Sequence, residues 1–307
     1  MTGKLIKKMS NCNCSATSNK EEQISDKMEK ERKTIREQYG RIARDESKEF
    51  EEKNIDPELQ NNESPLYSEE QMKSIPKGSN LGLGSGNPIA LANVQVGETV
   101  VDLGSGAGVD CFLAANKIGP KGKVIGVDMT ADMISLAREN ALKGNYKNVE
   151  FRLGEIEHLP IADNSTDLII SNCVINLASD KNQVFKEAFR VLKPGGRIVI
   201  SDIMFSKKLP EKVSMAFKGM ASCVSRAVVV DEYLDIIRKA GFVNVGVINE
   251  FSVQRKEQGS KKKKLEKLNK ITIISDGNKL ELELTPEEVK AMDNAIISAH
   301  VKAVKPN

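Results

Sequence analysis

The sequence predicts an α/β fold in which helices cover both faces of one doubly wound parallel sheet. Three observations predict it. Short apolar segments alternate with helical patterns from about residue 97 to residue 255. These apolar segments are continuous rather than half-polar, as expected for strands that are buried on both faces. A glycine-rich loop joins the first strand to the first helix, and ligands of such folds bind at the carboxyl ends of the strands.

The elements of this main domain follow one another after Gly97. The predicted strands are residues 99–104, 123–128, 149–155, 167–172 and 197–203, and the predicted helices among them are 109–118, 130–144 and 180–192. The last of these helices should end at "KPGG", because proline and glycine oppose further helical turns. A helix at 230–242 and a strand at 243–256 follow, so we assign the main domain to residues 78–256.

Residues 1–77 form an N-terminal region with a different pattern. The first 30 residues are polar and rich in lysine and glutamate, which predicts a flexible lead-in. From Ser25 to Phe50 the pattern is a charged helix with one apolar stripe, formed by Met28, Ile35, Tyr39 and Ile42. Such a stripe suits a helix that lies across a larger body.

The last segment, residues 257–307, predicts a small α+β domain of its own. A hairpin should turn at Asp276-Gly277-Asn278, a helix should begin near Thr285-Pro286-Glu287, and a strand should close the chain. Four consecutive lysines near the start of the segment are interpreted as a solvated surface.

Composition and charge argue against several classes of function. The 307 residues include 46 Lys and Arg against 43 Asp and Glu, a mixed surface that does not predict binding to nucleic acid. No apolar run approaches the roughly 20 residues that cross a bilayer, so no membrane partner is expected. The start of the chain lacks the apolar core of a signal peptide, and we expect a cytoplasmic monomer.

The five cysteines are predicted to be thiols rather than disulfides. Their number is odd, they are widely spaced, and no secretion signal precedes them; they are Cys12, Cys14, Cys111, Cys173 and Cys223. Because the chain has only two histidines, a zinc site is not expected. Cys111 is interpreted as a packing residue of the helix that follows the glycine loop.

The stretch "VVDLGSGAGVD" at 100–110 is the first candidate for a ligand site. Its glycine spacing differs from the G-x-G-x-x-G that suits a pyrophosphate. Asp102 lies inside the strand end, where a carboxylate needs a cationic or hydrogen-bonding partner. Asp128 ends the next strand, where an acid can accept the hydroxyls of a ribose. A ligand with a ribose, a positive group and no pyrophosphate is S-adenosylmethionine; alternatively, both aspartates only cap the following helices.

The motifs "VVDLGSGAG", "VIGVD" and "RVLKPGGRIVISD" resemble the conserved blocks of class I S-adenosylmethionine-dependent methyltransferases over roughly residues 97–255. The resemblance implies a Rossmann-like methyltransferase sheet, with a helical N-terminal extension and a small α+β C-terminal appendage. It also implies the cofactor contacts: the methionine portion against Gly104, Ser105 and Gly106, the ribose on Asp128, and the adenine beside Met129, Glu155 and Ile156.

Two thiols fall near the expected active site. Cys173 follows the fourth strand in "SNCVINL", where methyltransferases of this class present residues to the transferred methyl group, and Cys223 follows the fifth strand. Each cysteine alone is more often a small buried hydrophobe. Two together suggest a soft acceptor, because soft thiolates select soft partners. Trivalent arsenic is one, and its lone pair can attack a methyl carbon without a general base.

The block "SNCVINL", together with "VIGVDMTADMI" and "LGLGSGNP", closely resembles the arsenite methyltransferase family from about Tyr39 to residue 255. The ending "ISAHVKAVKP" also resembles a bacterial member. The resemblance implies S-adenosylmethionine-dependent methylation of arsenite or methylarsenite in arsenic detoxification, with a thiol reductant, glutathione or thioredoxin. It further implies Cys173 and Cys223 as arsenic ligands and Asn172 in the lining of the cofactor pocket.

The sequence departs from the family at further cysteine positions. Ser85 stands where many members have a third arsenic-site thiol, and the stretch after "YGRIA" lacks another. Two thiolates suit methylarsenite, which needs only two sulfur ligands; Cys12 or Cys14 is a minor candidate for a third. Arg226 adds charge after Cys223, where members usually have small residues. The alternatives are methylation of another metalloid or of a small organic molecule, or a non-catalytic metalloid-binding protein.

Overall fold

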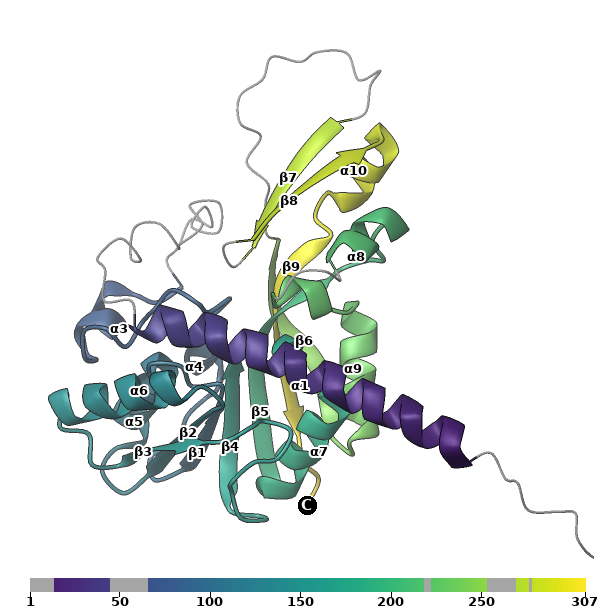
Figure 1. The fold of residues 1–307 in the computed structure, drawn as a ribbon. Helices are drawn as coiled ribbons and strands as arrows, with labels where there is room; N and C mark the ends of the chain where they lie inside the picture. Colours follow the sequence, from purple (N-terminus) through teal and green to yellow (C-terminus); the bar gives the residue numbers. More distant parts are fainter. Residues whose placement is uncertain (1–13, 45–65, 218–221, 253–268, 276–277) are drawn as a thin grey trace, which may run out of the picture.

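The computed structural model describes residues 14–44, 66–217, 222–252, 269–275 and 278–307. Its centre is a seven-stranded sheet with the strand order β3-β2-β1-β4-β5-β9-β6 (Figure 1). The strands are β1 (Thr99–Leu103), β2 (Lys123–Asp128), β3 (Val149–Leu153), β4 (Thr166–Asn172), β5 (Leu192–Phe205), β6 (Val243–Ser252) and β9 (Ile296–Val304). The first five pair in parallel, and β9 runs antiparallel between β5 and β6. The predicted α/β fold with a Rossmann-like sheet is confirmed.

Two apolar cores cover the two faces of the sheet. On one face, α5 (Val109–Ile118) and α6 (Ala131–Lys143) pack Phe112 and Ile134 against Val100. On the other face, α7 (Lys181–Val191) and α9 (Val230–Lys239) pack around Val101. Neighbouring residues of one strand enter different cores because successive side chains point to opposite faces. This explains why the strands are apolar throughout.

Shorter elements lie at the carboxyl ends of the strands and around the rim. They are α3 (Glu69–Lys73), α4 (Pro88–Leu91), α8 (Glu211–Phe217), and the 3₁₀ turns η2 (Ile175–Leu177) and η3 (Val224–Arg226). Cys173 directly follows β4 and lies two residues before η2, whereas Cys223 directly precedes η3 in the longer connection between β5 and α9.

The long helix α1 (Cys14–Arg44) crosses the molecule in front of the sheet (Figure 1). A helix across a larger body was predicted, and this helix begins at Cys14, eleven residues before the predicted start at Ser25. Residues 45–50, predicted as its last turns, lie outside the described residues. Within α1, Ile35 is buried against the body of the protein and Arg44 pairs with Asp132 of α6, so α1 is fixed by apolar and ionic contacts.

The C-terminal segment differs from the predicted separate domain. The hairpin of β7 (Asn269–Ser275) and β8 (Asn278–Leu284) and the helix α10 (Pro286–Met292) do form a small unit outside the sheet. The closing strand β9, however, is an interior strand of the main sheet, where it pairs with both β5 and β6. A boundary at residue 257 therefore cuts through the main domain.

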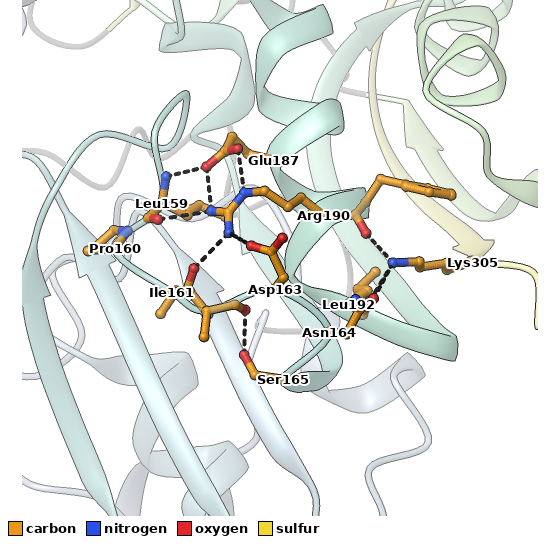
Figure 2. Close-up of polar contacts among 12 residues, drawn as sticks. Leu159, Pro160, Ile161, Asp163, Asn164, Ser165, Glu187, Arg190, Leu192 and Lys305 are labelled. Atoms are coloured by element: carbon orange, nitrogen blue, oxygen red, sulfur yellow. Dashed lines mark hydrogen bonds and ion pairs between the residues drawn. The ribbon is translucent and has the colours of Figure 1, made fainter.

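One arginine fastens the loop between β3 and β4 to α7 (Figure 2). The guanidinium of Arg190 donates to both carboxylate oxygens of Glu187, at 2.7 Å each, and to the carbonyls of Leu159 and Ile161. The backbone N–H of Leu159 donates to Glu187 in return, at 2.8 Å.

No helix among the described residues is long and apolar enough to span a membrane.

Candidate active site

A cavity opens at the carboxyl ends of β1, β2, β3 and β4, beneath α1. Its empty volume is about 1060 Å³, which includes space open to solvent. The glycine loop, the start of α6, the loop after β3, the "SNC" segment and residues 79–84 line it. Arg32, Ile35 and Tyr39 of α1 cover it. The sequence-predicted site and this cavity are therefore in the same part of the fold.

The glycine loop is shaped by close contact with the segment after β4. Gly104 has φ of +70°, and a Cβ atom there would lie 2.3 Å from the side chain of Val174. Only glycine fits, both because of this approach and because of the left-handed backbone. Gly104 and Ser105 line the cavity, as predicted. Gly106 instead donates its backbone N–H to Asp128, at 3.0 Å.

Asp128 is held at the cavity wall by two backbone donors. One carboxylate oxygen accepts from Gly106 and the other accepts from the N–H of Thr130, at 2.8 Å. Burial raises the pKa of Asp128 and these hydrogen bonds lower it. Each oxygen has two lone pairs, so both can still accept a hydroxyl. The capping and the ligand-binding interpretations of Asp128 are thus compatible.

Two further carboxylates lie at the base of the cavity, and both are 2% exposed. Asp102 accepts from the thiol of Cys111 at 3.2 Å, and Asp110 accepts from the hydroxyl of Tyr67 at 3.0 Å. Burial raises the pKa of Asp102, and it raises that of Asp110 to about 6. Neither makes an ion pair with a described residue. A ligand with a positive group would stabilise the charged form of both, and this fits a sulfonium or ammonium group.

Asn172 joins this base to the loop above it. Its amide oxygen accepts from the N–H groups of Ser85 and Gly86, at 2.9 and 3.2 Å, and its amide nitrogen donates to Gly86 and Tyr67, at 2.8 and 2.9 Å. Asn172 lines the cavity, as predicted, and it also holds "GSG" at 84–86 over the strand ends. Sequence reasoning did not select Tyr67 or Asp110, because neither belongs to a motif with a recognised spacing.

Met129 and Ile156, which the family resemblance placed beside the adenine, also line the cavity. The carboxylate of Glu155 lies 3.7 Å from the guanidinium of Arg32 and 3.6 Å from that of Arg36. Glu157, two positions further along the chain, lines the cavity; it is 6% exposed and accepts from the N–H of Ser179, at 2.9 Å. The contact of Glu155 with the adenine stays a prediction.

Both candidate thiols belong to one apolar cluster: Cys223 is buried in it with Ile35, Leu177 and Ile203, and Cys173 packs against it. Cys173 lines the cavity, whereas Cys223 is 9% exposed and lies at the start of η3. Cys173 has φ of +60°, a conformation that is uncommon for residues other than glycine and that occurs often at functional sites. Its N–H donates to the carbonyl of Ser201, at 2.8 Å, which holds the backbone in this turn.

The remaining cysteines and Ser85 lie elsewhere. Cys111 is fully buried in the core on the α5 face, where packing was predicted, and its thiol also donates to Asp102. Cys14 begins α1, and Cys12 lies outside the described residues. The hydroxyl of Ser85 is buried without a described hydrogen-bond partner and does not line the cavity.

Comparisons with known proteins show which proteins this chain is similar to. Residues 95–241 match the family described as a methyltransferase domain. An arsenite methyltransferase from Halobacterium salinarum is 43% identical over 253 residues, which are 78% of this chain and 65% of the relative. A human arsenite methyltransferase is 37% identical over 169 residues, 52% of this chain and 45% of the relative. The chain thus spans less than two thirds of the length of these relatives.

One solved structure is similar over most of the chain. It is the crystal structure of an arsenic(III) S-adenosylmethionine methyltransferase from Chlamydomonas reinhardtii, with a TM-score of 0.53 and 27% sequence identity. The match covers 82% of this chain and 73% of that protein.

Proposed function

We propose that the chain is a member of the arsenite methyltransferase family and that it transfers a methyl group from S-adenosylmethionine to a trivalent arsenical. The observation that carries the proposal is the position of Cys173: it lines the cofactor cavity and shares an apolar cluster with Cys223. Two thiols beside a methyl donor are what a soft, lone-pair-bearing substrate requires.

The cavity offers a partner for each part of S-adenosylmethionine. Asp128 would accept the ribose hydroxyls, and Met129 and Ile156 would flank the adenine. Glu157, rather than the predicted Glu155, would accept from the adenine amino group, because of these two glutamates only Glu157 lines the cavity. The buried pair Asp102 and Asp110 would face the cationic methionine end. When bound, the cofactor supplies a methyl group on a positively charged sulfur.

Cys173 and Cys223 would bind the arsenical before transfer. With methylarsenite, each of two As–O bonds is replaced by an As–S bond, and each thiol proton leaves in a water molecule. The arsenic lone pair would then form the As–C bond, and the electrons of the broken S–C bond would remain on the sulfur of the methyl donor. No general base is needed, and the role of the thiolates is to hold arsenic in line with the methyl carbon.

The substrate that fits two thiols is methylarsenite, because it already carries one carbon and needs two sulfur ligands. Arsenite can take three sulfur ligands, but Ser85 stands where many members of the family have the third thiol. The methylated arsenic is formally pentavalent, so its return to the trivalent state requires two electrons from a thiol reductant such as glutathione or thioredoxin. This requirement, and thiols that must remain reduced, suit the cytoplasm.

Methyl transfer to methylarsenite and to arsenite, measured by speciation of the products, tests the proposal. We expect wild type to methylate methylarsenite faster, and Cys173→Ser and Cys223→Ser each to lower the rate at least a hundredfold. Cys111→Ser is the matched control and should retain most of the activity. Ser85→Cys should raise the rate on arsenite relative to methylarsenite. Activity untouched by both site substitutions would eliminate the thiol-ligand mechanism.

A further inference from the structure

Arg226 connects the segment of Cys223 to the segment of Cys173. Its guanidinium donates to the carbonyls of Leu177 and Ala178, each at 3.2 Å, which end the turn that follows Cys173. A planar guanidinium has several fixed donors and suits two neighbouring carbonyls, whereas an ammonium group is a single point of charge. Arg226 lies three residues after Cys223, so these contacts bridge the two segments at the level of the thiols.

A second contact joins the same segments in the opposite direction. The ammonium group of Lys181, in the first turn of α7, donates to the backbone carbonyl of Arg226, at 2.9 Å. The turn from Ser222 to Ala227 is closed on itself, because Ser225 donates to Ser222 and Ala227 donates to Val224. The turn that contains Cys223 is therefore bonded to the segment after Cys173 through both the side chain and the backbone of Arg226.

A third contact reaches the helix that covers the cavity. The Arg226 guanidinium also pairs with Glu31 of α1, and only 24% of the arginine side chain is exposed. On the same helix, Arg32 and Arg36 lie near Glu155 at the other end of the cavity. Ile35, which lies between Arg32 and Arg36 in the sequence, packs in the apolar cluster that contains the two thiols. Helix α1 is thus joined to both ends of the site.

We propose that Arg226 is a positioning residue that holds the Cys223 segment against the Cys173 segment, so that both thiols bind one arsenic atom while α1 covers the cofactor. This inference rests on the proposed function and adds a residue that touches neither arsenic nor cofactor. Preorganisation matters here because the second As–S bond forms within one molecule. Its advantage over two separate bonds depends on how well the second thiol is already placed.

The consequence is specific to ligands that need two thiols. Phenylarsine oxide exchanges its oxygen for two As–S bonds and releases one water per molecule, whereas dimethylarsenite exchanges its single hydroxyl for one As–S bond. Loss of Arg226 should weaken binding of the first ligand and leave the second unchanged. A substitution that merely loosened the fold would weaken both, and it would also weaken the binding of S-adenosylhomocysteine.

The test is titration of the reduced full-length protein with both arsenicals, and with S-adenosylhomocysteine by calorimetry. For Arg226→Met we expect phenylarsine oxide to bind at least tenfold more weakly, with dimethylarsenite and S-adenosylhomocysteine within twofold of wild type. Arg226→Lys retains the positive charge but not the planar set of donors, so its loss of affinity for phenylarsine oxide should be intermediate. Glu31→Gln removes only the contact to α1 and should lower this affinity less than Arg226→Met does. Arg238→Met, on the exposed face of α9, is the control.

Failure of this inference and failure of the proposed function give different results. Unchanged phenylarsine oxide affinity in both Arg226 variants would overturn the role of Arg226. If Cys173→Ser and Cys223→Ser also left that affinity unchanged, the thiol pair itself would be wrong. If Arg226→Met did not fold, Arg226→Lys and Glu31→Gln would decide the question. Wild-type affinity for phenylarsine oxide in both of these variants would likewise overturn the proposal.

Discussion

Single residues of the site depend on partners that are distant in the chain. Asn172 contacts Tyr67, Ser85 and Gly86, which lie 86 to 105 positions before it. The resemblance to known methyltransferases predicted that Asn172 and Cys173 would lie near the cofactor, and both residues line the cavity. It did not predict the partners, because a hydrogen bond over such a separation depends on how the loop folds back and leaves no periodic signal.

Removal of the Asp128 carboxylate should affect the cofactor rather than the fold. Asp128→Ala loses the acceptors proposed for the ribose, and hydrogen bonds to charged groups contribute about 1.5–3 kcal/mol. We therefore expect S-adenosylhomocysteine to bind roughly ten- to a hundredfold more weakly by calorimetry. Asp235→Ala, an exposed aspartate of α9 paired at i,i+3, is the matched control. Equal affinities for the two variants would contradict the ribose assignment.

Asp202 should make stability depend on pH. It is fully buried and accepts from Asn176 at 2.9 Å and from Tyr233 at 3.1 Å. Burial raises the pKa of Asp202 to about 7. From about pH 4 to about pH 7 the unfolded carboxylate ionises while the folded one keeps its proton, so stability falls as pH rises through this window.

Asp202→Asn cannot ionise and should remove this slope. The amide oxygen can accept from Asn176, and the amide nitrogen can donate to the Tyr233 oxygen, so the contacts are retained. We expect the variant to gain stability relative to wild type as pH rises through the window, by at most roughly 4 kcal/mol. Urea unfolding at several pH values measures this, and parallel curves for the two proteins would refute it.

At the scale of elements, helices are held to their neighbours by a few polar contacts at the ends of the sheet. Helix α7 shows this, because Arg190 in its last turn holds the loop after β3 through Glu187, Asp163 and two carbonyls (Figure 2). This loop continues from the segment of Glu157 that lines the cavity. The sequence predicted the helix from its apolar spacing, but nothing in that spacing marks Arg190.

Arg190→Met should destabilise the protein by about 2 kcal/mol, because it leaves a partly buried Glu187 carboxylate and several carbonyls without their donor. The midpoint of urea unfolding measures the loss. Arg238→Met removes an exposed pair at i,i+3 and should change stability by less than about 0.5 kcal/mol. Similar midpoints for these two variants would mean that the Arg190 cluster adds no more than a surface ion pair.

At the scale of the whole molecule, the last strand completes the sheet from its interior. Strand β9 pairs along its length with β5 and also with β6, so the C-terminal residues stabilise the middle of the domain. The hairpin β7–β8 and α10 are instead an excursion between β6 and β9. At the base of this excursion, the side chains of Ser252 and Asn294 form a hydrogen bond of 2.8 Å.

This arrangement predicts that the excursion is dispensable and β9 is not. Replacement of residues 253–293 by a short Gly/Ser turn should leave cooperative unfolding and S-adenosylhomocysteine binding. Some stability should be lost, because Val213 and Phe217 of α8 lose the cover of Leu284. Deletion of residues 296–307 should abolish both properties. Circular dichroism and calorimetry measure them, and a folded protein without β9 would contradict the assigned topology.

The sequence by itself determined the features that depend on neighbours in the chain. Strand and helix periods, the turn glycines and the polar residues that end strands are local. They were enough to predict the parallel strands and the glycine loop between β1 and α5. The cofactor contact of Asp128 and the arsenic contact of Cys173 stay predictions. Glu155 was selected from a motif. In the structure its carboxylate pairs with Arg32 and Arg36 of α1, and Glu157 lines the cavity.

Only the tertiary structure decided which distant segments meet. It inserted β9 between β5 and β6, laid α1 over the cavity, and joined Arg226 to both the Cys173 turn and Glu31. The physical reason is that such contacts are selected by the packing of the whole chain against the entropy of closing long loops. Local patterns specify what each segment is, and long-range packing specifies what it touches.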